Sequence, residues 1–309
     1  KIYKDKGIYF TMKHKTIFTA DLHGYREQYE SLFKTSLEEG AQSVIIGGDL
    51  VAKGSINPIE QESFLRETLP AIVNDFKKKS NAQIYLMLGN DDVTTILDLL
   101  EAYSGNLWNH IDGKRFSITP DYEIIGYPYI PISPFQVKDF EKFDIRPKEE
   151  KKGLLKKVFG DDIVQPGATL EGEVWTKDGW VRKVFDRKNI DTTIEDDLNS
   201  LTFTTNPKKT VYIFHGPPYN TDLDVIPSLR HVGSKAIRQF VEKNEPYLVL
   251  SGHVHETADV TNRYSTNIGN SLAMTAGNGT DPTTLSLLVF DLYDPRNTTE
   301  RKVIRQKEK

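Results

Sequence analysis

The most informative stretch of this sequence lies near its start, where residues 16–24 read TIFTADLHG. The first five of these residues are apolar or β-branched, which predicts a buried β-strand over residues 16–20. A helical pattern follows over residues 25–39 and stops at Gly40. A strand followed directly by a helix is the first half of a βαβ unit, and this pair is repeated further along the chain.

The same alternation continues and indicates the fold class. A second strand, a helix and a third strand are expected over residues 43–46, 57–79 and 84–88. Further strands are expected at 123–126, 211–214 and 247–250, with a helix at 234–243. Strands separated by helices predict an α/β protein with a largely parallel sheet. The last expected strands, at 266–268, 272–275 and 286–292, have no helices between them and predict an antiparallel section or a second sheet.

Residues 131–207 interrupt this alternation. They are rich in charges of both signs and contain the Gly, Trp and Val spacing of a hairpin. A long excursion inside a compact domain is more often functional than idle, so we interpret this segment as an inserted cap that shapes a pocket. Trp175 and Trp180 are expected to pack within the hairpin rather than stack on a nucleobase. The main domain is expected to span residues 12–309, and residues 1–11 are a natural lead-in or an expression remnant.

Composition excludes several classes of protein. The chain has no cysteine, which excludes disulfide frameworks, iron–sulfur clusters and thiol catalysis. The net charge of −4 argues against a protein whose main role is to coat nucleic acid. No apolar run approaches the ~20 residues of a membrane span, and the start of the chain lacks the apolar region of a signal peptide. We therefore expect a cytoplasmic protein with no membrane partner.

Side chains that bind metals follow five of the expected strands. The motifs read DLHG at 21–24, GGD at 47–49, GNDD at 89–92, HGPP at 215–218 and GHVH at 252–255. Ligands of open α/β sheets bind outside the carboxyl ends of the strands, so these five ends are expected to meet at one edge. Imidazole and carboxylate ligands without thiolates suit Mn, Fe, Zn, Ni or Co. Asp49 is the natural bridge between two ions, because a carboxylate has two oxygens.

In this order the motifs resemble those of the calcineurin-like metallophosphoesterase family, from residue 16 to residue 277 with the segment 131–207 outside the match. The resemblance implies a two-sheet αββα sandwich with a dinuclear metal site at the carboxyl ends of the strands. It implies two divalent ions, with Mn²⁺ expected first and Fe, Zn, Ni or Co as alternatives. It also implies the ligands: Asp21, His23 and His255 for the first ion, Asp49 as the bridge, and Asn90, His215 and His253 for the second.

One position departs from the family pattern. The family usually has Asn-His-Asp or Asn-His-Glu where this chain has Asn90-Asp91-Asp92. The missing His normally contacts the phosphate and helps to protonate the leaving group, whereas an ionised Asp91 donates no hydrogen bond. Asp91 is a catalytic candidate that either faces away or binds the metal-bound water. His231 is the second catalytic candidate, as a donor to substrate beside an anion site formed by the amides at 233–234, and its alternative role is a helix cap.

The expected function is that of a metal-dependent phosphohydrolase that cleaves phosphoester bonds, phosphodiesters in particular, with a metal-bridging hydroxide. Two alternatives are a nuclease acting on DNA or RNA ends and a non-catalytic metal-binding scaffold. The acidic charge argues against the nuclease, and the complete ligand set argues against the scaffold. The expected partner is a small phosphoester, with a nucleotide as one candidate, and nucleic acid is not excluded.

Overall fold

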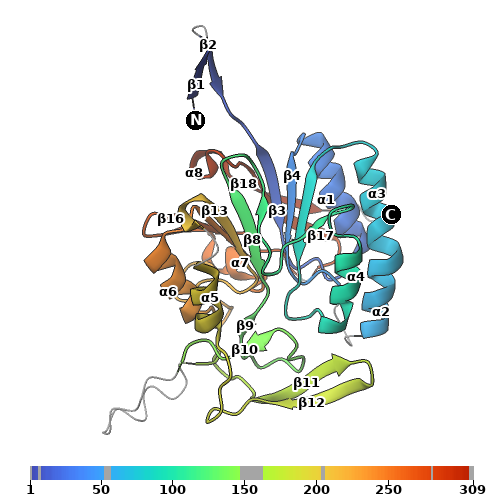
Figure 1. Cartoon of the computed structure of the whole chain (residues 1–309), viewed down its shortest axis with the longest axis vertical. Coiled ribbons are helices and arrows are strands. Elements are labelled where there is room, and N and C mark those ends of the chain that lie inside the picture. The colour runs from blue at the N-terminus through green and yellow to red at the C-terminus, as the bar shows by residue number, and fades with distance from the viewer. Residues whose placement is uncertain are drawn as a thin grey trace.

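The computed structural model describes residues 2–5, 8–51, 57–146, 163–202, 206–279 and 281–305. Two six-stranded sheets pack face to face, and helices cover their outer faces (Figure 1). The αββα sandwich predicted for this α/β protein is therefore confirmed. In the described parts of the chain, no helix combines the length and the apolar character needed to cross a membrane.

The first sheet has the strand order β18-β17-β3-β4-β5-β6. Strands β3, β4, β5 and β6 run parallel, and β17 joins β3 in the antiparallel direction with Leu288 opposite Phe18. The strands are β3 (Lys15–Thr19), β4 (Ser43–Gly47), β5 (Gln83–Met87), β6 (Asn109–His110), β17 (Thr284–Asp291) and β18 (Glu300–Arg305).

The second sheet has the order β15-β16-β14-β13-β8-β7. Strands β8, β13, β14 and β16 are parallel, and the edge strands β7 and β15 are antiparallel to their neighbours. The strands are β7 (Phe116–Ser117), β8 (Glu123–Tyr127), β13 (Thr210–Phe214), β14 (Leu248–Ser251), β15 (Ser265–Ile268) and β16 (Ser271–Thr275). The expected antiparallel section therefore divides, because β15 and β16 extend this sheet and the chain then returns to the first sheet as β17.

Helices form the two outer layers. Those over the first sheet are α1 (Arg26–Glu38), α2 (Pro58–Ser63), α3 (Leu69–Lys77) and α4 (Leu97–Ala102), with short turns η1 (Phe64–Thr68) and η2 (Thr94–Ile96). In the described part of the chain, the other helices are α5 (Ile194–Thr202), η4 (Pro207–Lys209), α6 (Lys235–Asn244), α7 (Thr257–Thr261) and α8 (Pro295–Thr298). The helix expected over 57–79 is present but contains a π-helical turn at η1. Pro70 explains this turn, because it lacks the N–H that would bond to the carbonyl four residues earlier.

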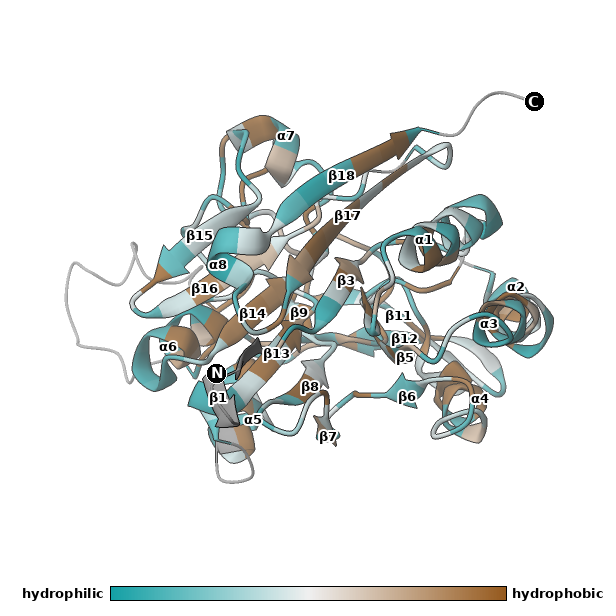
Figure 2. Ribbon diagram, turned by 90° about the horizontal axis from the view of Figure 1, so that it is seen from above, coloured by the Kyte–Doolittle hydropathy of each residue, from teal (hydrophilic) through white to brown (hydrophobic). Residues whose placement is uncertain are grey.

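The alternation of side chains along each strand produces three apolar layers. Phe18 and Ile45 point between the two sheets, where they meet Ile213 and Leu250. Their neighbours along the same strands point outward: Ile17, for example, belongs to the cluster under α1 and α3. Viewed from above, the central strands β14 and β17 are mainly hydrophobic, whereas α6 shows both hydrophilic and hydrophobic residues (Figure 2). This packing holds the carboxyl ends of both parallel sections at one edge of the sandwich.

The segment 131–207 lies across that edge in its described part, and residues 147–162 and 203–205 lie outside the described residues. It begins with β9 (Ile130–Pro131) and β10 (Glu141–Lys142) and contains the hairpin of β11 (Glu171–Thr176) and β12 (Gly179–Val184). Trp175 and Trp180 pack edge to face across the hairpin, as expected, with ring centroids 5.2 Å apart. The last part of the segment forms α5, which packs on the second sheet beside α6. At the N-terminus, β1 (Ile2–Asp5) and β2 (Ile8–Thr11) pair as a hairpin that projects from the sandwich (Figure 1).

Candidate metal centre

Four of the expected ligands have an unusual backbone conformation. The φ angles are +59° at Asp21, +46° at His23, +49° at Asp49 and +67° at His253. Residues with a side chain rarely adopt this left-handed conformation, which costs roughly 1–3 kcal/mol at each position. Hydrogen bonds between strand ends maintain it, because Asp21 N donates to the Gly48 carbonyl at 3.0 Å and His23 N donates to that of Asp49 at 2.9 Å. Such conformations concentrate at functional sites.

The first group of ligand atoms comes from the ends of β3, β4 and β14. Asp21, His23, Asp49 and His255 are buried, and each offers one ligand atom within 4.8 Å of the others. His23 Nε2 lies 3.3 Å from His255 Nε2 and 3.9 Å from Asp49 Oδ2. His255 Nε2 lies 3.8 Å from Asp21 Oδ1. Two imidazoles and two carboxylates that converge in this way form a donor set suited to a divalent transition-metal ion.

The second group forms around His215 at the end of β13. His215 Nδ1 donates to the Gly47 carbonyl at 3.0 Å, so its Nε2 carries the lone pair when the ring is neutral. That Nε2 lies 3.0 Å from Asn90 Oδ1 and 3.3 Å from Asp49 Oδ1. When the ring is neutral, three acceptor atoms face one another, and a cation between them removes their repulsion. His253 lies beside this group, with its ring centroid 5.4 Å from that of His215.

Asp49 connects the two groups. Its Oδ2 faces His23, and its Oδ1 faces His215 and accepts the backbone N–H of Asp91 at 2.9 Å. Burial opposes the charge on Asp49, but His215 and His23 outweigh it and hold the pKa of Asp49 well below its usual range. Burial likewise opposes the charge on His215, yet the Asp49 carboxylate raises the pKa of His215 to about 10. A proton shared by His215 Nε2 and Asp49 Oδ1 thus lies where a metal cation would bind both atoms.

Glycines next to the ligands make room for ligand side chains. A Cβ at Gly89 would collide with Asp49 Oδ1 and would lie 2.6 Å from His215 Cε1. A Cβ at Gly252 would lie 2.9 Å from Asp21 Oδ2. These two glycines therefore let the ligand side chains approach one another.

Asp92 fixes the backbone that carries the ligands. It is fully buried and accepts the backbone N–H groups of Leu50 at 3.1 Å, Val51 at 3.0 Å and Gly89 at 2.8 Å. Burial, reinforced by the charge of Asp49, raises the pKa of Asp92 well above its usual range. These hydrogen bonds join the loops after β4 and β5 through Asp92.

Asp91 is turned toward two of the expected ligands. Its Oδ1 accepts Asn90 Nδ2 at 2.8 Å, and its Oδ2 lies 3.8 Å from His23 Nδ1. Because the Asn90 amide donates to Asp91, its oxygen points at His215 and the second group. Asp91 therefore does not face away from the expected ligands, and its binding of a metal-bound water stays a prediction. Its direct participation in catalysis stays a prediction.

His231 does not line the cavity beside the ligands, although its chain neighbours Arg230 and Val232 do. Its Nδ1 is 2.7 Å from Asp224 Oδ1, and the Asp224 side chain is fully buried. The anion site expected beside it is wrong, because the amide of Gly233 donates to Asp224 and that of Ser234 donates to the Pro217 carbonyl. The observed contacts favour a structural role for His231, although Ser234 rather than His231 caps α6. The expected contribution of His231 to turnover is untested.

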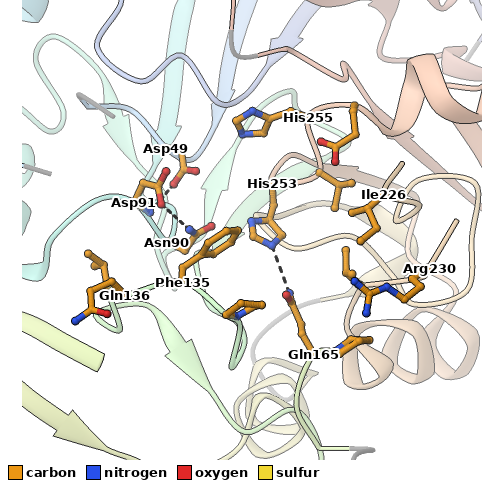
Figure 3. A pocket seen from close by; sticks show the side chains of 16 residues that line it. Asp49, Asn90, Asp91, Phe135, Gln136, Gln165, Ile226, Arg230, His253 and His255 are labelled. Atoms are coloured by element: carbon orange, nitrogen blue, oxygen red, sulfur yellow. Dashed lines mark hydrogen bonds between the residues drawn. The ribbon is translucent and has the colours of Figure 1, made fainter. Parts of the chain in front are cut away.

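A cavity of about 490 Å³ opens beside the ligands (Figure 3). Its walls come from three parts of the chain. The metal-binding edge contributes Asp49, Asn90, Asp91, His253 and His255. The segment 131–207 contributes Pro134, Phe135, Gln136, Val137, Gln165 and Pro166, and the loops after β13 and β14 contribute Ile226, Arg230, Val232, Val254 and Glu256.

Gln165 and Phe135 bring the inserted segment into contact with an expected ligand. Gln165 Nε2 lies 3.4 Å from His253 Nε2, and the Phe135 ring stands edge-on to the same imidazole (Figure 3). Gln165, Phe135 and Arg230 were not predicted as site residues. They belong to no recognisable motif. The only indication in the sequence for Gln165 and Phe135 was their position in the inserted segment 131–207.

The calcineurin-like phosphoesterase family model matches residues 14–257. The chain therefore belongs to the calcineurin-like phosphoesterase family, as the motifs indicated. A comparison with curated protein sequences gives no match.

Solved structures share the fold at low sequence identity. One matches with a TM-score of 0.60 at 14% identity, covering 96% of this chain and 100% of the other. The protein TT1561 of Thermus thermophilus matches with a TM-score of 0.55 at 14% identity, covering 95% of this chain and 99% of its own. A dimetal phosphatase from Danio rerio matches with a TM-score of 0.51 at 12% identity, covering 95% of this chain and 99% of its own.

Proposed function

We propose that this protein is a hydrolase that uses two divalent metal ions to cleave phosphoester bonds, with phosphodiesters as preferred substrates. The position of Asp49 carries the proposal. One of its oxygens faces the pair His23 and His255, and the other faces His215. A carboxylate placed between two groups of nitrogen and oxygen ligands is the arrangement that a dinuclear centre requires. Membership of the calcineurin-like phosphoesterase family supports the same chemistry.

The chain offers a complete set of side chains for two ions. The first would be held by Asp21, His23 and His255, the second by Asn90, His215 and His253, and Asp49 would be shared. When bound, two such ions supply a nucleophilic water near neutral pH and neutralise charge on the phosphoryl oxygens. Because the donors are imidazoles, carboxylates and an amide, Mn²⁺ is the first ion to test, followed by Fe, Zn, Ni and Co.

The residues around these ligands favour phosphodiesters. Asp91 lines the cavity beside Asn90 and carries a carboxylate where the family usually has a proton-donating His. A carboxylate repels the two negative charges of a phosphomonoester more strongly than the single charge of a diester. It also donates no proton to the leaving group, so activated leaving groups are favoured over alkoxides.

The test combines metal content with hydrolysis. Protein reconstituted with Mn²⁺ should approach about two ions per chain and should hydrolyse bis(p-nitrophenyl) phosphate faster than p-nitrophenyl phosphate. Asp49→Ala should lose most of the metal and the activity, while Asp98→Ala, which removes an exposed carboxylate of α4, should keep both. If the protein holds two ions but hydrolyses neither ester, the proposal is wrong and the protein is a metal-binding scaffold. Preference for single-stranded DNA over both esters would favour the nuclease.

A further inference from the structure

Phe135 is a large apolar side chain that remains exposed beside the metal-binding edge. It lines the cavity and exposes 50% of its surface. Its ring lies edge-on to His253, with 6.0 Å between the centroids and 85° between the planes (Figure 3). Aromatic side chains left uncovered in a cavity wall typically contact a ligand, since exposure of that apolar surface to water is unfavourable.

A buried ion pair fixes the turn that carries this ring. Lys138 Nζ lies 2.7 Å from Glu141 Oε2, and both side chains are fully buried. Lys138 Nζ also donates to the Ser133 carbonyl at 2.8 Å, and Glu141 accepts the Ser133 hydroxyl and, at 3.0 Å, its backbone N–H. The Ser133 hydroxyl in turn accepts the Phe135 N–H at 3.0 Å. Buried ion pairs contribute little net stability, but this network holds the turn in one geometry.

Such rigidity favours ligand binding. A ring on a mobile loop would lose conformational freedom when it contacts a ligand, whereas a ring on a fixed turn has already lost it. Only two torsion angles of the Phe135 side chain itself remain to be ordered. The network around Ser133 therefore presents a preorganised aromatic surface to the cavity.

The remaining walls suit a flat group with polar edges. The other apolar residues that line the cavity are Pro134, Val137, Pro166, Ile226, Val232 and Val254. Gln136 adds an amide that both donates and accepts hydrogen bonds. A purine or pyrimidine combines a flat π face with hydrogen-bond donor and acceptor atoms at its edge.

We infer that Phe135 is a specificity-determining residue that stacks on the base of a nucleotide substrate, so that the preferred phosphoesters are those of nucleosides. The inference rests on the proposed function, because a phosphoryl group at the metal-binding edge places the rest of the substrate in this cavity. Stacking of a base on an aromatic side chain corresponds to about a tenfold gain in affinity.

The test compares two ligands that differ by the base alone. Binding of adenosine 5′-monophosphate and of ribose 5-phosphate to the Mn²⁺-loaded protein is measured by isothermal titration calorimetry, together with hydrolysis of bis(p-nitrophenyl) phosphate. Wild type should bind the nucleotide about tenfold more tightly. Phe135→Ala should remove most of that difference in affinity without weakening the binding of ribose 5-phosphate. Phe135→Tyr should retain the difference. Val184→Ala truncates an apolar side chain of the same segment that is 55% exposed and lies outside the cavity lining, and it should behave as wild type.

Each alternative result has a distinct meaning. Equal affinities for the two ligands in wild type, with hydrolysis intact, would overturn the inference and leave the proposed function standing. A tenfold preference that survives Phe135→Ala would overturn the assignment to Phe135. Complete absence of phosphoester hydrolysis would overturn the proposed function and this inference with it.

Discussion

Replacement of Asp91 by Ala tests why this chain has a carboxylate where its family usually has a histidine. The Asp91 carboxylate accepts Asn90 Nδ2 at 2.8 Å, which turns the amide oxygen toward His215. A hydrogen bond to a charged acceptor is worth about 1.5–3 kcal/mol. Loss of a residue that orients a metal ligand typically weakens metal binding about 10- to 100-fold, which agrees with that range. We therefore expect the Mn²⁺ dissociation constant of Asp91→Ala to rise about 10- to 100-fold.

The assay is a titration in which free Mn²⁺ is followed by its electron paramagnetic resonance signal. Asp91→Asn retains an oxygen that can accept the Asn90 amide, so its affinity should lie between those of wild type and Asp91→Ala. Asp98→Ala removes an equal charge from an exposed position and should bind Mn²⁺ as wild type does. Unchanged metal affinity in Asp91→Ala, combined with a large fall in kcat, would refute the positioning role and would show that Asp91 acts on the substrate instead.

Four further outcomes are expected. Asp91→His should raise the rate with p-nitrophenyl phosphate relative to the diester at saturating Mn²⁺; an unchanged ratio would show that repulsion and proton donation at this position do not set the preference. His231→Ala should lower the thermal midpoint with little change in kcat, because this side chain binds a buried carboxylate and does not line the cavity. A fall in kcat at an unchanged thermal midpoint would instead support a catalytic role for His231. Asp92→Ala should lower the free energy of unfolding by about 3 kcal/mol or more, measured with urea, because three buried N–H groups lose their acceptor, and Asp92→Asn should lose less. His110→Gln should lower the free energy of unfolding more at pH 6 than at pH 8. Burial opposes the charge on His110, but two neighbouring carboxylates raise its pKa. The charged ring therefore stabilises the fold fully below about pH 6.5, and this stabilisation is lost as the pH rises through the raised pKa. An equal cost of His110→Gln at both pH values would show that its charge does not contribute.

The residue patterns alone predicted parallel strands separated by helices, with metal-binding side chains at the strand ends, because both depend on local information. The two-sheet sandwich and the full ligand set followed from the resemblance to the family. The strand expected at 16–20 is observed as β3 (Lys15–Thr19), and the one expected at 84–88 as β5 (Gln83–Met87). Apolar strands separated by helices must run parallel, which brings their carboxyl ends to one edge. Asp21 and Asp49 follow two such ends, so their proximity results from strand topology and does not depend on the details of packing.

The tertiary structure alone decided how the remaining side chains are used. Whether Asp91 faces the substrate, the solvent or Asn90 depends on hydrogen bonds that form when the loops after β4 and β5 meet. His231 is held by Asp224, a partner that no spacing rule identifies. Gln165 and His253 are 88 residues apart in the chain but 3.4 Å apart in space. Contacts of this kind depend on how a long inserted segment packs, and packing depends on the shapes of many side chains together. The order of strands and helices, in contrast, follows from a periodic pattern that can be recognised in the sequence.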